Sequence, residues 1–119
     1  LAQGIVSSLA MRDARKGRTL HRYYSEMTRS LREMLRVLRP DRAAVVVVGT
    51  SVMRGLDTRT HECLADIGSA IGFDVVGIAV RRLDRDRRMM PARSDAVRAS
   101  LIEQRMHEEY VIGFHKPGA

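Results

Sequence analysis

Apolar side chains recur at every third or fourth position from residue 20 to residue 38, and charged residues fill the positions between them. This spacing predicts an amphipathic helix with one face turned toward a core. Pro40 ends the helix, because the residue before a proline is steered toward an extended conformation. The apolar stripe consists of Leu20, Tyr23, Tyr24, Met27, Leu31, Met34, Leu35 and Leu38.

Short apolar runs after this helix predict three strands. Residues 43–48 are valine-rich and contain no alternating polar residue, which is typical of a strand covered on both faces. Residues 73–80 form a second strand, in which Gly77 indicates a bulge or a close packing contact. A third strand is expected from about Tyr110 to Lys116.

The stretch between the first two strands predicts a loop and then a helix. Residues 49–56 are expected to form the loop. Asp57 or Thr58 can cap a helix that runs to about residue 71, and Gly72 suits a left-handed stop after it. The order helix–strand–helix–strand–loop–strand predicts an α/β fold.

The chain has 119 residues, which is close to the commonest size of one domain, and no repeat or linker divides it. Residues 1–19 are mixed in pattern and carry a basic run from Arg12 to Arg18, so we expect a loop or a loosely docked segment there. The first residue is Leu rather than Met, which favours a piece of a longer protein.

Charge and composition narrow the classes of partner and location. The formal net charge is +7, which favours an anionic partner such as nucleic acid but also fits a solvated basic surface. No apolar run has the roughly 18 residues that a membrane span needs, so no membrane partner is expected. A single cysteine excludes an internal disulfide, and a cytoplasmic location is expected.

An arginine-rich stretch is the strongest sequence signal for binding. Arginine side chains match phosphate groups in a bidentate way, so this stretch is a candidate nucleic-acid contact. The alternative is a solvated loop in which Asp84 and Asp86 pair with the arginines. The candidate residues are Arg81, Arg82, Arg85, Arg87, Arg88 and Arg93.

Gly49, Thr50 and Ser51 follow the first strand and could line a cleft at its carboxyl end. They do not form a known phosphate-binding loop, because neither G-x-x-x-x-G-K-[ST] nor G-x-G-x-x-G occurs in the chain. No metal site is predicted, since neighbouring residues such as His61 and Cys63 point in different directions on a helix. Cys63 is expected to be a buried core thiol.

Several motifs in order resemble the C-terminal half of SAM-dependent DNA methyltransferases that modify an exocyclic amino group of adenine or cytosine. The motifs are YYSEMTRSLREMLRVLRP, VVVGTS, THECLADIGSAIGFDVVGIAVRRL, RRMMP and EEYVIGFHKP, and they span about residues 20–117. The resemblance implies a partial Rossmann-like methyltransferase sheet with flanking helices. It also implies DNA as the partner and methyl transfer from SAM to the amino nitrogen of a flipped base.

The chain departs from this family in ways that bear on activity. The family's Pro-Gly-Gly turn is Pro40-Asp41-Arg42 here, and Thr50 replaces an Asn. The glycine-rich SAM turn and the Pro-Pro-aromatic catalytic motif are both absent, so no catalytic or cofactor residue is assigned. We expect the chain alone to bind no SAM and to be inactive.

Two kinds of protein therefore remain open. The chain is either the C-terminal part of a methyltransferase, which would pair with its missing N-terminal half or form a homo-oligomer, or a non-enzymatic basic module that binds nucleic acid or protein.

Overall fold

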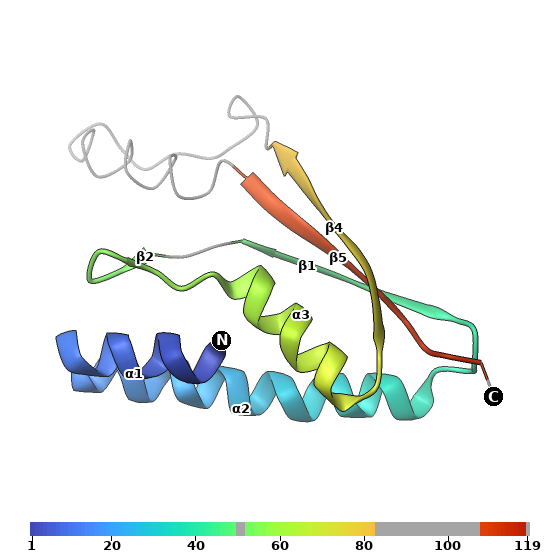
Figure 1. The fold of residues 1–119 in the computed structure, drawn as a ribbon, viewed down its shortest axis with the longest axis horizontal. Coiled ribbons are helices and arrows are strands. Elements are labelled where there is room, and N and C mark those ends of the chain that lie inside the picture. Colours follow the sequence, from blue (N-terminus) through green and yellow to red (C-terminus); the bar gives the residue numbers. More distant parts are fainter. Residues whose placement is uncertain (50–51, 83–107, 119) are drawn as a thin grey trace, which may run out of the picture.

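The computed structural model describes residues 1–49, 52–82 and 108–118. Figure 1 shows a twisted sheet with the helices gathered on one side of it. The α/β class predicted from the sequence is confirmed. In chain order the elements are α1 (Ala2–Arg12), α2 (Ala14–Val37), β1 (Ala43–Gly49), β2 (Val52–Met53), β3 (Leu56–Asp57), α3 (Thr60–Ile71), β4 (Asp74–Arg82) and β5 (Glu108–His115).

The last strand lies in the middle of the main sheet. The strand order is β1–β5–β4, and β5 is antiparallel to both neighbours. β1 and β4 therefore run in the same direction, with α3 as the connection between them. The register shifts between Val75 and Gly77, which confirms the irregularity predicted at this glycine.

A turn at residues 40–42 leads from α2 into β1 and is tied to the end of β5. Asp41 has a φ of 66°, a left-handed conformation that a short polar side chain tolerates better than most. Its backbone N–H donates to the carbonyl of Lys116, and the Lys116 N–H donates to the carbonyl of Arg42. Asp41 thus adopts in this turn a conformation that glycine adopts most readily.

The core lies between the three helices and the inner face of the sheet, and α3 packs closely on the central strand. Gly68 of α3 faces the ring of Phe114, so closely that an added Cβ would overlap that ring. Phe114 and Ile112 of β5 are fully buried, and the rings of Phe73 and Phe114 lie 5.1 Å apart. The missing side chain at Gly68 therefore lets α3 approach the central strand.

The two ends of α3 bear out one prediction and correct another. Gly72 has a φ of 122°, and the next backbone N–H donates to the Gly68 carbonyl, so the predicted glycine stop is confirmed. The N-cap is Arg59 in a left-handed conformation, not Asp57 or Thr58. Asp57 instead accepts the Arg59 N–H at 2.9 Å, which fixes the turn before the helix.

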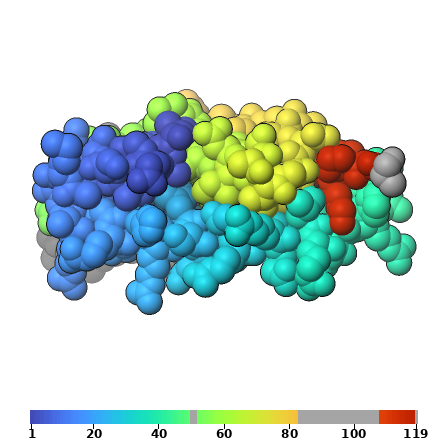
Figure 2. Space-filling model, turned by 60° about the horizontal axis from the view of Figure 1, so that its bottom comes forward, coloured from blue at the N-terminus to red at the C-terminus, as the bar shows by residue number. Residues whose placement is uncertain are grey.

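Residues 1–19 are not the loop or loosely docked segment that the sequence suggested. They form α1 and the start of α2, an antiparallel helical hairpin in which Ile5 and Leu9 are buried. Figure 2 shows α1 and α3 following one another along the same side of α2. Gly17 makes this packing possible, because it brings the α2 backbone against Ala10. The sequence did not reveal this helix because Gln3, Gly4, Ser7 and Ser8 interrupt its apolar positions.

The other face of the sheet is open in the part of the chain that the structure describes. Val45, Val47 and Val76 lie on this face and are 63%, 50% and 74% exposed. Val45 pairs with Gly113, beside which Val76 also lies, so the three valines and this glycine form one apolar surface, the open face. Within the described residues, α2 and α3 cover one side of β1 only, so the predicted cover on its other face is not found there.

None of the described helices combines the length and the apolar composition needed to cross a bilayer.

Candidate functional site

A cleft lies at the carboxyl end of β1. Gly49 contributes to its wall, whereas Thr50 and Ser51 lie outside the described residues. The cleft has a volume of about 270 Å³ and a mostly apolar lining. We call it the apolar cleft; it is lined by Thr19, Leu20, Tyr23, Gly49, Met53 and Thr60.

One wall of this cleft comes from a small hairpin that the sequence did not predict. Residues 49–56 were expected to be a loop, but β2 and β3 pair within and just beyond them. Arg54 and Gly55 form the turn with φ values of 51° and 76°, as a tight hairpin turn requires. The usual Asn-Gly or Asp-Gly signal is absent, because an arginine holds the first left-handed position.

A second cleft adjoins the first and is strongly basic. It has a volume of about 300 Å³ and shares Thr19 and Met53 with the apolar cleft. It lies where the hairpin turn meets the beginning of α2. We call it the basic cleft; it is lined by Asp13, Arg15, Lys16, Thr19, Met53 and Arg54.

Asp13 organises the basic cleft. One carboxylate oxygen accepts the backbone N–H of Lys16 at 3.1 Å and so caps α2, while the other accepts from Arg54 Nε at 2.8 Å. The Lys16 N–H and then the Arg54 guanidinium hold the pKa of Asp13 below its ordinary value. Arg12 donates to the Arg54 carbonyl at 3.1 Å, so α1 also fixes the hairpin.

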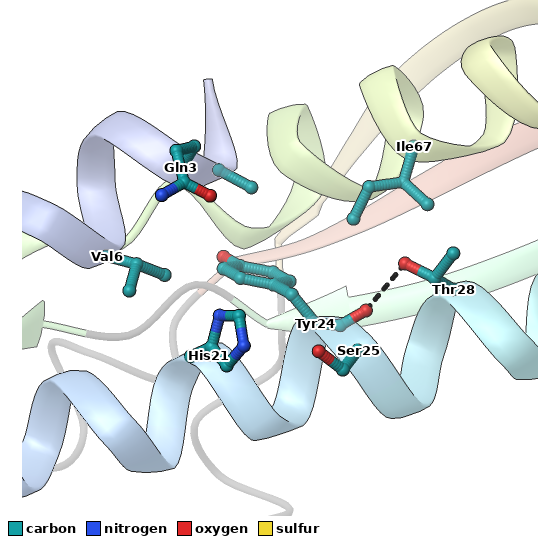
Figure 3. A pocket seen from close by; sticks show the side chains of 8 residues that line it. Gln3, Val6, His21, Tyr24, Ser25, Thr28 and Ile67 are labelled. Atoms are coloured by element: carbon teal, nitrogen blue, oxygen red, sulfur yellow. Dashed lines mark hydrogen bonds between the residues drawn. The ribbon is translucent and has the colours of Figure 1, made fainter.

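A third cleft, of about 180 Å³, lies among the three helices and is drawn in Figure 3. Tyr24 of α2 lies between Val6 of α1 and Ile67 of α3. Its hydroxyl donates to the Thr58 carbonyl at 3.2 Å, and burial raises its pKa. Tyr24 therefore links α2 to the segment before α3, and its hydroxyl is committed to this structural contact.

Cys63 is a buried core residue, as the sequence predicted. Its side chain is fully inaccessible, its thiol donates to the Thr58 carbonyl at 3.6 Å, and burial raises its pKa. The neighbouring His61 ring stacks on Tyr110 at 3.6 Å between centroids. Across residues 1–49, 52–82 and 108–118, no cluster of three or more His, Cys, Asp or Glu side chains has the arrangement of a metal site.

The predicted arginine contacts are only partly placed. Arg81 and Arg82 are not in a loop but are the last two residues of β4, because the strand extends to pair with β5. Arg81 forms an ion pair with Glu109, so its charge already has a partner. Arg85, Arg87, Arg88 and Arg93 lie outside the described residues.

Sequence reasoning missed Arg54 as a member of a basic site. Arg54 and Asp13 are 41 positions apart, and only the hairpin brings them together. The basic run from Arg12 to Arg18 is the sequence signal for this site, but the sequence alone predicts a loose segment there.

Comparison with known proteins identifies solved structures with a similar fold. No protein-family model and no curated protein sequence matches the chain. A similar fold occurs in part of a solved protein. This protein, TTHA0409 from Thermus thermophilus, carries a provisional assignment as a DNA modification methylase. Its selenomethionine structure superposes with a TM-score of 0.64 at 21% identity, over 86% of this chain and 40% of that chain.

A second structure of TTHA0409, solved in complex with S-adenosyl-L-methionine, gives a TM-score of 0.60 at 22% identity, over 83% of this chain and 39% of that one. Identity this low shows a shared fold. The chain therefore has the fold of a methyltransferase-like region and spans about two fifths of the length of the methylase that it resembles.

Proposed function

We propose that this chain is one part of a SAM-dependent DNA methyltransferase that methylates an exocyclic amino nitrogen of adenine or cytosine. The observation that carries the proposal is the fold shared with about 40% of a DNA modification methylase, one structure of which holds SAM. The ordered motifs between residues 20 and 117 support the amino-methylating class.

The open face has the character of an interface with another polypeptide. Val45, Val47 and Val76 present a continuous apolar surface to solvent, and such surfaces commonly mark an interface. In the described part of the chain, β1 is also paired along one edge only, which leaves hydrogen-bonding groups at the other edge. The remaining part of a methylase fold, or a second copy of this chain, would cover both features.

The described residues do not fit SAM. A SAM turn needs glycines between the end of a strand and the start of a helix, where backbone N–H groups converge. Two glycines with positive φ are described: Gly55 lies in the β2–β3 turn, and Gly72 lies at the carboxyl end of α3. We therefore assign SAM binding and the catalytic Pro-Pro-aromatic motif to the remaining part of the methylase fold. No reaction step is derived from this chain.

Contact with DNA is part of the proposal. The net charge of +7 suits a polyanion, and Arg85, Arg87, Arg88 and Arg93 remain candidate phosphate contacts. The competing function is a non-enzymatic basic module that binds nucleic acid or protein, which the same charge also favours.

A reconstitution assay tests the proposal. The chain is produced together with the polypeptide encoded by the adjoining reading frame, and the transfer of tritiated methyl groups from SAM to DNA is measured. Chromatography of the digested DNA should reveal N6-methyladenine or N4-methylcytosine. The isolated chain should transfer none.

Variants of the open face make the assay specific. Val45→Lys/Val47→Lys should abolish assembly and transfer together, since charges on this face oppose burial. The matched control Val37→Lys/Val52→Lys changes two valines that are also exposed, 66% and 42%, but lie elsewhere. An assembly that binds DNA but neither binds SAM nor transfers methyl groups would favour the non-enzymatic module.

A further inference from the structure

We infer that the basic cleft binds a phosphate group of a nucleic-acid strand, and that the apolar cleft beside it accepts the attached sugar or base. This deepens the proposed function and rests on it for the choice of DNA as the partner. It adds a binding site at the junction of α2 and the β2–β3 hairpin, distant in sequence from the arginine-rich stretch.

The charge balance of the basic cleft favours an anion. Three cationic side chains, those of Arg15, Lys16 and Arg54, line it together with one carboxylate, Asp13. The Asp13 carboxylate is already used by the Lys16 N–H and by Arg54. Neither Arg15 nor Lys16 has a carboxylate partner among the residues that the structure describes, so both side chains are available to a ligand.

The walls of the cleft are held in place by contacts. It lies at the amino end of α2, where the Asp13 carboxylate accepts the Lys16 N–H and already occupies the positive end of the helix dipole. The Asp13–Arg54 ion pair and the Arg12 hydrogen bond hold the hairpin against this helix end. The cationic groups therefore belong to a wall that is fixed by contacts between three segments.

The neighbouring apolar cleft favours a nucleotide over a bare anion as the ligand. The two clefts share Thr19 and Met53, and beyond them lie Leu20 and the half-exposed ring of Tyr23. Aromatic rings beside a basic groove are typical of nucleic-acid sites, because bases stack on them without regard to sequence. A phosphate in one cleft would thus leave its sugar or base over the other.

The test is a salt titration of DNA binding with two matched double variants. Arg15→Ala/Lys16→Ala removes two charges from the basic cleft, and both side chains are exposed, so the fold should persist. Arg29→Ala/Arg32→Ala removes two exposed charges from the same helix, outside the clefts. Affinity for a fluorescent DNA duplex is measured by anisotropy across a range of salt concentrations.

The cleft variant should flatten the plot of log affinity against log salt by up to about two units, since each phosphate contact contributes about 0.9. The helix control should keep the wild-type slope. Tyr23→Ala should weaken binding by roughly 5- to 150-fold, the equivalent of about 1–3 kcal/mol of base stacking, without changing the slope.

Three results would overturn the inference: no DNA binding by the wild-type chain, equal slopes for the wild type and the cleft variant, or equal losses in both double variants. Complete displacement of DNA by inorganic phosphate at matched ionic strength would indicate a general anion site instead. The reconstituted methyl-transfer assay separates the two proposals. Methylation with unchanged slopes would contradict binding at the basic cleft but not the methyltransferase function. A flattened slope without methylation would contradict the methyltransferase function but not binding at the cleft.

Discussion

The contact between α1 and α2 can be tested by a single added methyl group at Gly17. A Cβ built at this position would lie 2.7 Å from both Cα and Cβ of Ala10 and 3.0 Å from its backbone nitrogen. Non-bonded carbon atoms are normally separated by about 3.5–4.0 Å, so α1 would have to move by roughly 1 Å. The backbone of Ala10 cannot rotate away as a flexible side chain would.

The expected change in stability follows from two opposing effects. Overpacking of this kind costs about 1–3 kcal/mol, while alanine in place of glycine within a helix gains about 0.5–1 kcal/mol. Gly17→Ala should therefore lower the free energy of unfolding by roughly 0.5–2 kcal/mol. Gly4→Ala is the matched control, because Gly4 is a glycine of α1 with no atom within 4 Å of an added Cβ.

Urea denaturation followed by circular dichroism measures both variants against the wild type. Gly4→Ala should be neutral or stabilising, and the difference between the two variants isolates the overpacking at roughly 1–3 kcal/mol. Equal, stabilising effects of the two substitutions would refute the close packing of α1 on α2. Residues 1–19 would then be the loosely docked segment that the sequence suggested.

Three further predictions concern Asp13, Cys63 and the open face. The folded-state pKa of Asp13 is depressed, so the carboxylate contributes stability at pH values above its ordinary pKa of 3.8, and this contribution is lost as the pH falls through the lower folded-state pKa. The urea midpoint should therefore decline less steeply at acid pH for Asp13→Ala than for the wild type. Cys63 is fully buried with a raised pKa, so a chromogenic thiol reagent should leave the native chain unmodified at neutral pH and modify one thiol per chain in denaturant; rapid native labelling would contradict its burial. The isolated chain should associate through the open face. Light scattering should therefore give a mass above that of one chain for the wild type and for Val37→Lys/Val52→Lys, and the mass of a monomer for Val45→Lys/Val47→Lys. A wild-type monomer at high concentration would count against this association.

The local pattern of the sequence was sufficient for the main elements. The three- and four-residue spacing from Leu20 to Leu38 specified α2 from Leu20 to its carboxyl end, and the valine run specified β1, because these signals depend on neighbours in the chain. Gly72 marked the end of α3 for the same reason, since a positive φ is a local requirement. The order of these elements was enough to predict the α/β class.

Other features depended on contacts between distant residues. The place of β5 between β1 and β4 joins residue 43 to residue 115, and no local pattern encodes that choice. Burial on one face of β1 depends on which helices reach the sheet, whereas the valine run predicts only that it is apolar. The helix at residues 2–12 was not predicted because small and polar residues interrupt its apolar positions, and the burial of Ile5 and Leu9 requires Gly17 on another helix.

The candidate site divides in the same way. The sequence marked Gly49 as the end of a strand, and it marked Arg12 to Arg18 as basic. It could not place Arg54 beside Asp13, because that ion pair forms only when a hairpin turn folds back onto the start of α2. The sequence thus determines the charge of each residue. Tertiary packing determines that these charges gather in one cleft, because it brings together groups 41 positions apart.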